Sequence, residues 1–275
     1  MNLQSAALAV ICLLLARTSL CAQQVDKNDT LEHRQALEMV FADSIVPQDR
    51  HEMMLTTGAW YSHSGSVHDV MLTQKIEWGI TEKFQISGFS NPVHNSNSSG
   101  QGVTGIGDFE LGARYTWTDV GSRFTHIALA ADVGFPSGNP LTGMGEGAYR
   151  FSPAVLLSHE IRVGRYHAFT TTGFDFVLAR RRANIPDDDT SRHVVFVNSG
   201  FAARAGSGWT IGEVSFNSNR WSGGDVTNVL VTPSYVWRLA RRSELLIGLP
   251  IGLTASADNI GAVVKFTFEL GGTED

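Results

Sequence analysis

The sequence predicts an all-β chain, a transmembrane antiparallel up-and-down β-barrel of about twelve strands. Three observations predict it. The stretch 105–138 alternates between two faces with the two-residue period of β-strands. The same alternation recurs along the chain as far as residue 270. The connections between the predicted strands alternate between short and long, which is typical of outer-membrane barrels.

The stretch 105–138 shows the pattern most clearly, as a hairpin with one apolar face. Before the turn at 119–122, the apolar face carries Phe109, Leu111, Ala113, Tyr115 and Trp117. The opposite face carries charged residues, glycine and threonine. Each arm is about ten residues long and the apolar face ends in aromatic residues, as expected of a tilted strand that crosses a bilayer.

The composition agrees with a barrel. Hydrophobic residues make up 43% of the 275 residues, charged residues make up 17%, and glycine occupies 28 positions. A helical membrane protein would be far more apolar, whereas a barrel interleaves apolar with polar residues. The formal net charge of −6 argues against nucleic acid as a partner. The only two cysteines, Cys12 and Cys21, lie near the N-terminus, so we expect no disulfide in the rest of the chain.

The N-terminus carries a targeting segment. The apolar run from Ala6 to Ala16 is as long as the hydrophobic region of a signal peptide and too short to span a membrane as a helix. We expect cleavage after Cys21 or Ala22, so that residues 1–22 are a signal peptide that directs the chain to a bacterial outer membrane. The alternative, lipidation of Cys21, requires a small preceding residue, and a leucine stands there.

Residues 23–52 form a polar segment before the first predicted strand. A capping-box pattern begins at Asp29, and apolar residues follow at helical intervals up to Ile45, so a short helix is expected before Pro47. We interpret this segment as a periplasmic N-terminal extension. The alternative is a plug that enters the barrel.

The barrel domain is predicted over 53–275. Its strands are expected near 53–63, 69–81, 83–91, 107–117, 124–135, 149–163, 166–179, 193–204, 209–219, 228–239, 244–254 and 261–270. The alternation is poorest in the strand near 209–219. Longer polar loops are expected at 94–104, 136–147 and 179–192, all on the side opposite the short turns. Outer-membrane barrels have short periplasmic turns and longer outer loops, so both termini would be periplasmic.

Two runs of the sequence resemble a known family. The run G-x-G-D-F-E-L-G-A-R-Y at Gly105–Tyr115 and the later F-P-S-G-x-P run that ends at Pro140 are similar to strands of the MetA-pathway of phenol degradation family of outer-membrane barrels. The resemblance covers the chain from Met53 onward. It implies a barrel that transports small molecules, aromatic ones among them, and it supplies no catalytic residues. The chain departs from a common barrel ending, because its last residue is Asp275 rather than an aromatic residue.

Charged residues lie opposite the apolar faces, and we assign them to the lumen because each Lys or Arg would cost about 2–4 kcal/mol at the lipid midplane. These lumen-facing candidates are Lys75, Glu77, Asp108, Glu110, Arg114, Asp132, Glu160, Arg162, Asp175, Arg204, Arg238, Lys265 and Glu269. They would line a narrow, weakly ion-selective pore, or pair across the lumen and hold it shut. A barrel of about twelve strands lies between filled small barrels and open large ones.

Other polar residues give weaker indications. Ser158 and His159 are adjacent, but no third residue completes a hydrolase triad beside them. His63, His68 and His94 are expected in outer-loop regions, where scattered histidines are usually solvated rather than metal-bound. An arginine run at 180–182, followed by three aspartates, would meet lipopolysaccharide or pair with itself.

We therefore predict a narrow outer-membrane channel for uptake or efflux of small molecules, aromatic or hydrophobic ones among them. Its expected partners are outer-membrane lipid, lipopolysaccharide and a small-molecule solute. We expect no enzymatic activity, cofactor or metal. The alternative is a non-conducting structural or surface barrel, and a hydrolase site at the rim is a remote one. The sequence leaves the oligomeric state open.

Overall fold

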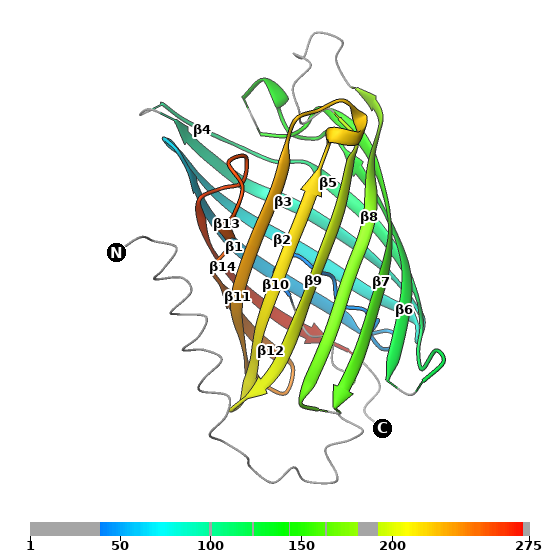
Figure 1. Ribbon diagram of the computed structural model, residues 1–275. Coiled ribbons are helices and arrows are strands. Elements are labelled where there is room, and N and C mark those ends of the chain that lie inside the picture. Colours follow the sequence, from blue (N-terminus) through cyan, green and yellow to red (C-terminus); the bar gives the residue numbers. More distant parts are fainter. Residues whose placement is uncertain are drawn as a thin grey trace.

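The protein folds into one closed antiparallel β-barrel (Figure 1). The computed structural model describes residues 39–98, 101–122, 124–142, 144–162, 164–180 and 192–271. The strands are β1 (Met53–Ser64), β2 (Val67–Thr81), β3 (Phe84–Ser98), β4 (Gln101–Gly105), β5 (Phe109–Trp117), β6 (Thr125–Phe135), β7 (Ala148–Arg162), β8 (Tyr166–Arg180), β9 (Val194–Ala205), β10 (Gly208–Ser218), β11 (Thr227–Ala240), β12 (Ser243–Gly248), β13 (Ile251–Gly252) and β14 (Ile260–Leu270).

The strands follow one another around the wall in sequence order, and β1 pairs with β14 to close it. Because β12 and β13 are two pieces of one strand and β4 lies off the path, twelve strands make up the wall. The predicted fold class is confirmed. The described residues also include two 3-10 turns, η2 (Pro140–Thr142) and η4 (Arg220–Ser222), and no helix among them is long and apolar enough to cross a membrane.

Two local predictions are wrong. The stretch 94–104, expected to be a polar loop, is a hairpin in which β3 continues and pairs with β4. The predicted strand 244–254 is interrupted at Pro250, because proline has no N–H to donate to a ladder. The strand near 209–219, which alternates poorly, is confirmed as β10. Three histidines expected in loop regions, His63, His68 and His94, lie within strands β1, β2 and β3.

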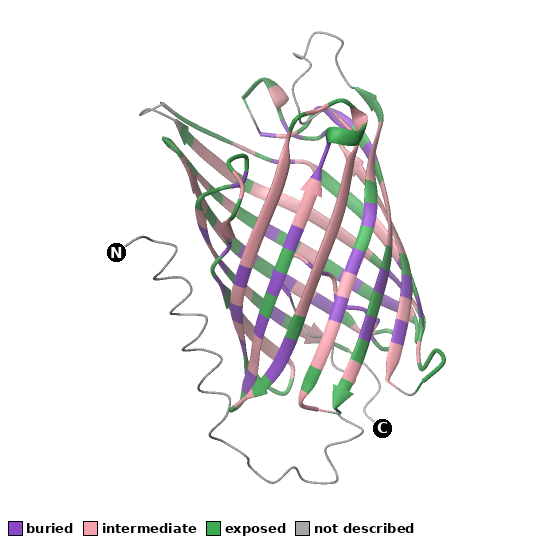
Figure 2. Cartoon of the chain, in the orientation of Figure 1, coloured by how far each residue is buried: buried purple, intermediate pink, exposed green. Residues whose placement is uncertain are grey.

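The two faces of the wall differ as a membrane barrel requires. Figure 2 shows buried and exposed residues alternating along the strands. On β5, the outward residues Leu111, Tyr115 and Trp117 are 39–48% exposed, whereas the inward Arg114 and Thr116 are at most 6% exposed. The outer surface is thus apolar and the inner surface polar, because successive side chains of a strand point to opposite faces.

Aromatic residues gather toward both ends of the outer surface. Tyr115 and Trp117 pack at a ring-centroid distance of 4.8 Å near the end where the short turns lie, which we call the short-turn end. Phe109, Phe135 and Tyr149 form a chain of ring contacts, 6.1 and 6.2 Å between centroids, near the opposite, long-loop end. Two such bands are typical of the interfaces of a bilayer.

Residues 39–49, which we call the lumen segment, run inside the barrel (Figure 1). The chain is bent and non-helical there, and the rest of the expected helix lies outside the described residues. Residues 39–49, which belong to the polar segment 23–52, therefore lie inside the barrel, where a plug would lie. The division of the chain at residues 22 and 52 stays a prediction, because residues 1–38 lie outside the described residues, as do the arginines and aspartates within 181–191.

Candidate functional site: the lumen

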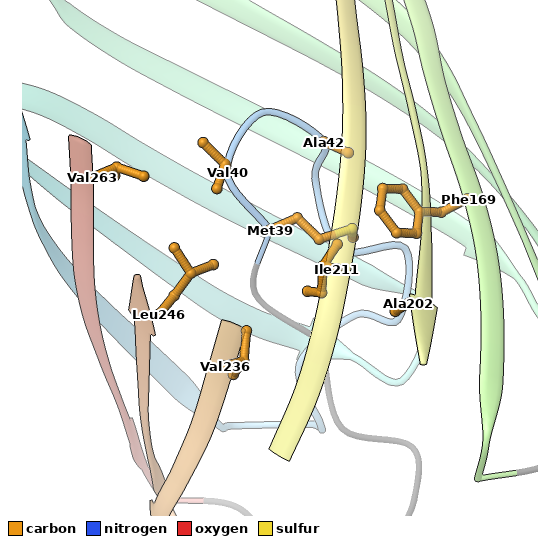
Figure 3. Packing of buried hydrophobic residues seen from close by; sticks show 9 residues of the cluster. All are labelled: Met39, Val40, Ala42, Phe169, Ala202, Ile211, Val236, Leu246 and Val263. Carbon is orange, nitrogen blue, oxygen red and sulfur yellow. The ribbon is translucent and has the colours of Figure 1, made fainter. Parts of the chain in front are cut away.

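The lumen segment divides the interior into two unlike halves. On one side, Met39, Val40 and Ala42 pack against the wall formed by β8 to β14. That wall supplies Phe169, Ala202, Ile211, Val236, Leu246 and Val263, and all of these apolar side chains are buried (Figure 3). The lumen segment is thus packed closely against this side of the wall, which we call the filled half, and close-packed apolar groups leave little room for water.

The other half of the lumen is hollow. A cavity of about 440 Å³, the inner cavity, lies between the lumen segment and the wall formed by β1, β2, β3, β5 and β6. Its size falls within the range of about 300–1,000 Å³ that is usual for small-molecule sites. Aromatic side chains line it at Phe41, Trp60 and Phe89, and the first two pack with their centroids 5.5 Å apart.

A network of ion pairs joins the lumen segment to the inner cavity. Lys75 Nζ lies 2.9 Å from Asp43 of the segment and 3.3 Å from Glu77 on its own strand. Glu77 is 2% exposed, lies 3.6 Å from Arg114 and accepts a hydrogen bond of 2.6 Å from Gln85. Each charge therefore has an opposite charge or a donor beside it, which a buried charge requires.

The short-turn end of the lumen segment is held through its backbone. Arg114 donates to the carbonyl oxygen of Ser44, and Thr116 donates to that of Ile45 (3.0 Å). Next along the segment, the backbone approaches β2 at Gly79, where an added Cβ would lie 2.1 Å from the carbonyl oxygen of Asp49. Glycine is needed at this position, because any side chain would displace the lumen segment.

A second cavity of about 340 Å³, the outer cavity, lies toward the long-loop end and shares Met71 and Glu110 with the inner one. The loop between β6 and β7 lines it. Asp108 fixes this loop by accepting the backbone N–H groups of Gly138 (2.8 Å) and Glu146 (2.7 Å).

A chain of ion pairs lines the outer cavity. Arg150 on β7 pairs with Glu146 of the loop and lies 2.7 Å from Asp175 on β8. Asp175 also accepts a hydrogen bond of 3.0 Å from Ser152. The two cavities adjoin each other along the wall, where Met71 and Glu110 line both, and together we call them the hollow; charged residues of both signs line its outer part.

The structure gathers most of the predicted lumen residues around this hollow. Those that line one of the two cavities are Lys75, Glu77, Asp108, Glu110, Arg114, Asp132, Asp175 and Lys265. Asp132 fits because Gly112 stands opposite it, where a Cβ would lie 2.1 Å from its carboxylate. The remaining candidates lie nearer the short-turn end, outside both cavities, and are Glu160, Arg162, Arg204, Arg238 and Glu269.

Besides Thr116, sequence reasoning missed other residues that hold the lumen segment, among them Asn198, which donates to the carbonyl oxygen of Phe41 at 3.2 Å. Glu213 is 1% exposed and accepts backbone hydrogen bonds from the segment, and Gln85 accepts one from Gln48 at 3.1 Å. The sequence does contain an indication that Glu213 has a role in the lumen. Glu213 is a lone acid within a predicted strand, but that strand alternates poorly because both Ile211, which points inward, and Val214, which points outward, are apolar.

The suggested hydrolase pair does not form a site. Ser158 is 1% exposed and points inward, whereas His159 is exposed on the outer surface and bonds to Thr125 at 2.9 Å. Adjacent residues of a strand point to opposite faces, so these two cannot act together. Among the described residues, no group of three or more His, Cys, Asp or Glu side chains could hold a metal ion.

Solved structures share this fold. An outer-membrane channel from Pseudomonas putida F1 matches with a TM-score of 0.65 at 9% sequence identity, over 84% of this chain and 100% of that one. The NanC porin matches with a TM-score of 0.53 at 10% identity, over 78% of this chain and 100% of that one. No family model and no curated protein matches the chain. At these identities the likeness shows the fold, that of outer-membrane channel barrels, while the resemblance to the phenol-degradation family stays a prediction.

Proposed function

We propose that the protein is a narrow outer-membrane channel for small solutes, small aromatic molecules among them. The observation that carries the proposal is that the inner and outer cavities follow one another along one side of the lumen, with Met71 and Glu110 lining both. In the orientation usual for such barrels, the outer cavity opens toward the exterior and the short-turn end lies in the periplasm.

The lining supports a small and partly apolar solute. Phe41, Trp60 and Phe89 offer ring faces, while the charged side chains nearby are held in ion pairs across the hollow. Paired charges of opposite sign cancel much of each other's field, so the channel should discriminate by size and shape more than by charge. Met71 and Glu110, which line both cavities, form what we call the neck, and a solute that moves from one cavity to the other would pass them.

Blocking the neck tests the proposal. Glu110→Trp places a ring in the hollow and should slow the entry of small sugars, which lipid alone excludes, into liposomes that contain the purified protein. Leu111→Trp is the matched control, because the neighbouring residue points to lipid and its ring leaves the hollow free. Equal entry rates for the two variants and the unaltered chain would show that solutes do not pass this way.

The second candidate function is a non-conducting structural barrel. The close packing of Met39, Val40 and Ala42 against the wall favours it, because half of the lumen is filled. A barrel of this kind would show no solute entry in any variant, although it folded correctly.

A further inference from the structure

Two ionisable residues of the wall hold the backbone of the first part of the lumen segment, Met39–Ala42. The Glu213 carboxylate on β10 accepts the N–H groups of Val40 (2.7 Å), Phe41 (3.2 Å) and Ala42 (3.0 Å). Lys265 on β14 donates to the carbonyl oxygens of Met39 (2.6 Å) and Val40 (3.3 Å). All five hydrogen bonds go to peptide groups, so these two side chains recognise a peptide backbone rather than particular side chains.

The wall around these two residues suits the side chains of a peptide. Ile211, Val236 and Leu246 form an apolar surface on which Met39 and Val40 rest (Figure 3). Together, the carboxylate, the ammonium group and this surface complement the three parts of a peptide strand: its N–H groups, its carbonyl groups and its apolar side chains. Pairing of both backbone groups is the usual basis of peptide recognition by extended chains.

The barrel closes without the lumen segment. Eleven residue pairs join β1 to β14, and residues 39–49 belong to no strand. If the segment left, Glu213 and Lys265 would face lumen water, which hydrates charged groups well. A permanent filling needs no such charges, since apolar groups of similar volume are often at least as stabilising as buried charges. The wall is therefore suited both to a bound peptide and to water.

We propose that the wall around Glu213 and Lys265 is a peptide-binding site whose resident ligand is the chain's own Met39–Ala42. The ligand is displaceable, and its departure opens the filled half of the lumen to solutes. This inference rests on the proposed channel function for its consequence, but the binding itself is independent of conduction.

The test removes the resident ligand and returns it as a separate molecule. The barrel lacking residues 23–44 should conduct more than the full chain, and a synthetic peptide of residues 37–45 should bind it and reduce its conductance. The same peptide with N-methyl groups at Val40 and Ala42 keeps every side chain but lacks two N–H donors. It should bind at least about tenfold more weakly, because a hydrogen bond to a charged group contributes about 1.5–3 kcal/mol.

The variant Glu213→Gln should weaken binding of the unmodified peptide similarly, whereas Gly212→Ala, at the neighbouring position where an added Cβ meets nothing within 4 Å, should not. Equal binding of the two peptides, or none, would overturn the proposal. Fluorescence anisotropy of labelled peptide reads binding directly, so a barrel that binds peptide but never conducts would refute the channel and keep the site.

If the truncated barrel does not fold, the full-length protein is used to test the proposal instead. Glu213→Gln should then raise the fraction of time spent at high conductance, and an unchanged fraction would overturn the proposal. In a chain that does not conduct, exposure of the lumen segment to protease tests the same point: cleavage within 39–44 should be faster in Glu213→Gln than in Gly212→Ala, and equal rates would overturn the proposal.

Discussion

Replacing the outward-facing Leu111 with arginine should hinder folding of the barrel into lipid, whereas replacing its inward-facing neighbour Glu110 with glutamine should not. Leu111 points outward on β5, paired with Gly88 and Val133, and is 48% exposed before lipid is considered. It lies between the aromatic bands, two residues from Phe109 and four from Tyr115. It is therefore inside the apolar belt, nearer the long-loop band, where a charge is still costly.

The magnitude follows from this position. Arginine at the midplane costs about 2–4 kcal/mol, which is roughly a 30- to 700-fold change in the folding equilibrium, and the effect at Leu111 should lie toward the lower end because this residue is nearer one aromatic band. The neighbouring Glu110 lines both cavities, so Glu110→Gln keeps a polar group in a polar space and should change stability by less than about 1 kcal/mol. Urea-dependent folding into lipid vesicles, followed by the gel-mobility difference between heated and unheated samples, measures both effects.

Equal tolerance of Leu111→Arg and Glu110→Gln would refute the reasoning, because a one-residue shift in register exchanges the two faces of the strand. Greater damage from Glu110→Gln would contradict it in the same way.

The remaining predictions concern location, the lumen segment and the outer loop. The protein should fractionate with the outer membrane and migrate faster on gels before heating; recovery as a soluble periplasmic protein would contradict this. Gly79→Ala should cost about 1–3 kcal/mol in urea unfolding, because its Cβ would displace the lumen segment, whereas Gly212→Ala meets open space and should be nearly neutral. Arg114→Met should cost about 1–3 kcal/mol, and a double-mutant cycle with Glu77→Gln should show coupling; additive losses would exclude their interaction. Asp108→Ala should free the loop that it holds and raise conductance, and unchanged conductance would show that this loop does not limit passage.

The strands could be predicted from sequence because each follows the alternation that burial on one face imposes. On β5, Leu111, Ala113 and Tyr115 alternate with Glu110 and Arg114, so the pattern predicted both the strand and the direction of its charges. The pattern predicted β10 less well. Ile211 packs against the lumen segment inside the barrel, so the inner face of this strand is partly apolar as well.

The lumen segment could not be placed from its sequence. Val40, Phe41 and Ile45 have helical spacing, and the same residues suit a soluble extension. Their positions are decided instead by distant partners, since Glu213 bonds to Val40 across 173 residues of sequence. The hairpin of β3 and β4 escaped prediction for a related reason: its polar residues, such as Asn95 and Thr104, pair with each other at 2.6 Å beyond the apolar wall, so no buried face imposes alternation.

Single-channel recording in planar bilayers tests the central claim most directly. Purified protein that is heat-modifiable on gels should give small, reproducible conductance steps, and these steps should shrink in Glu110→Trp but not in Leu111→Trp. No conductance from correctly folded protein, either as the full chain or without residues 23–44, would contradict the channel and leave a filled structural barrel.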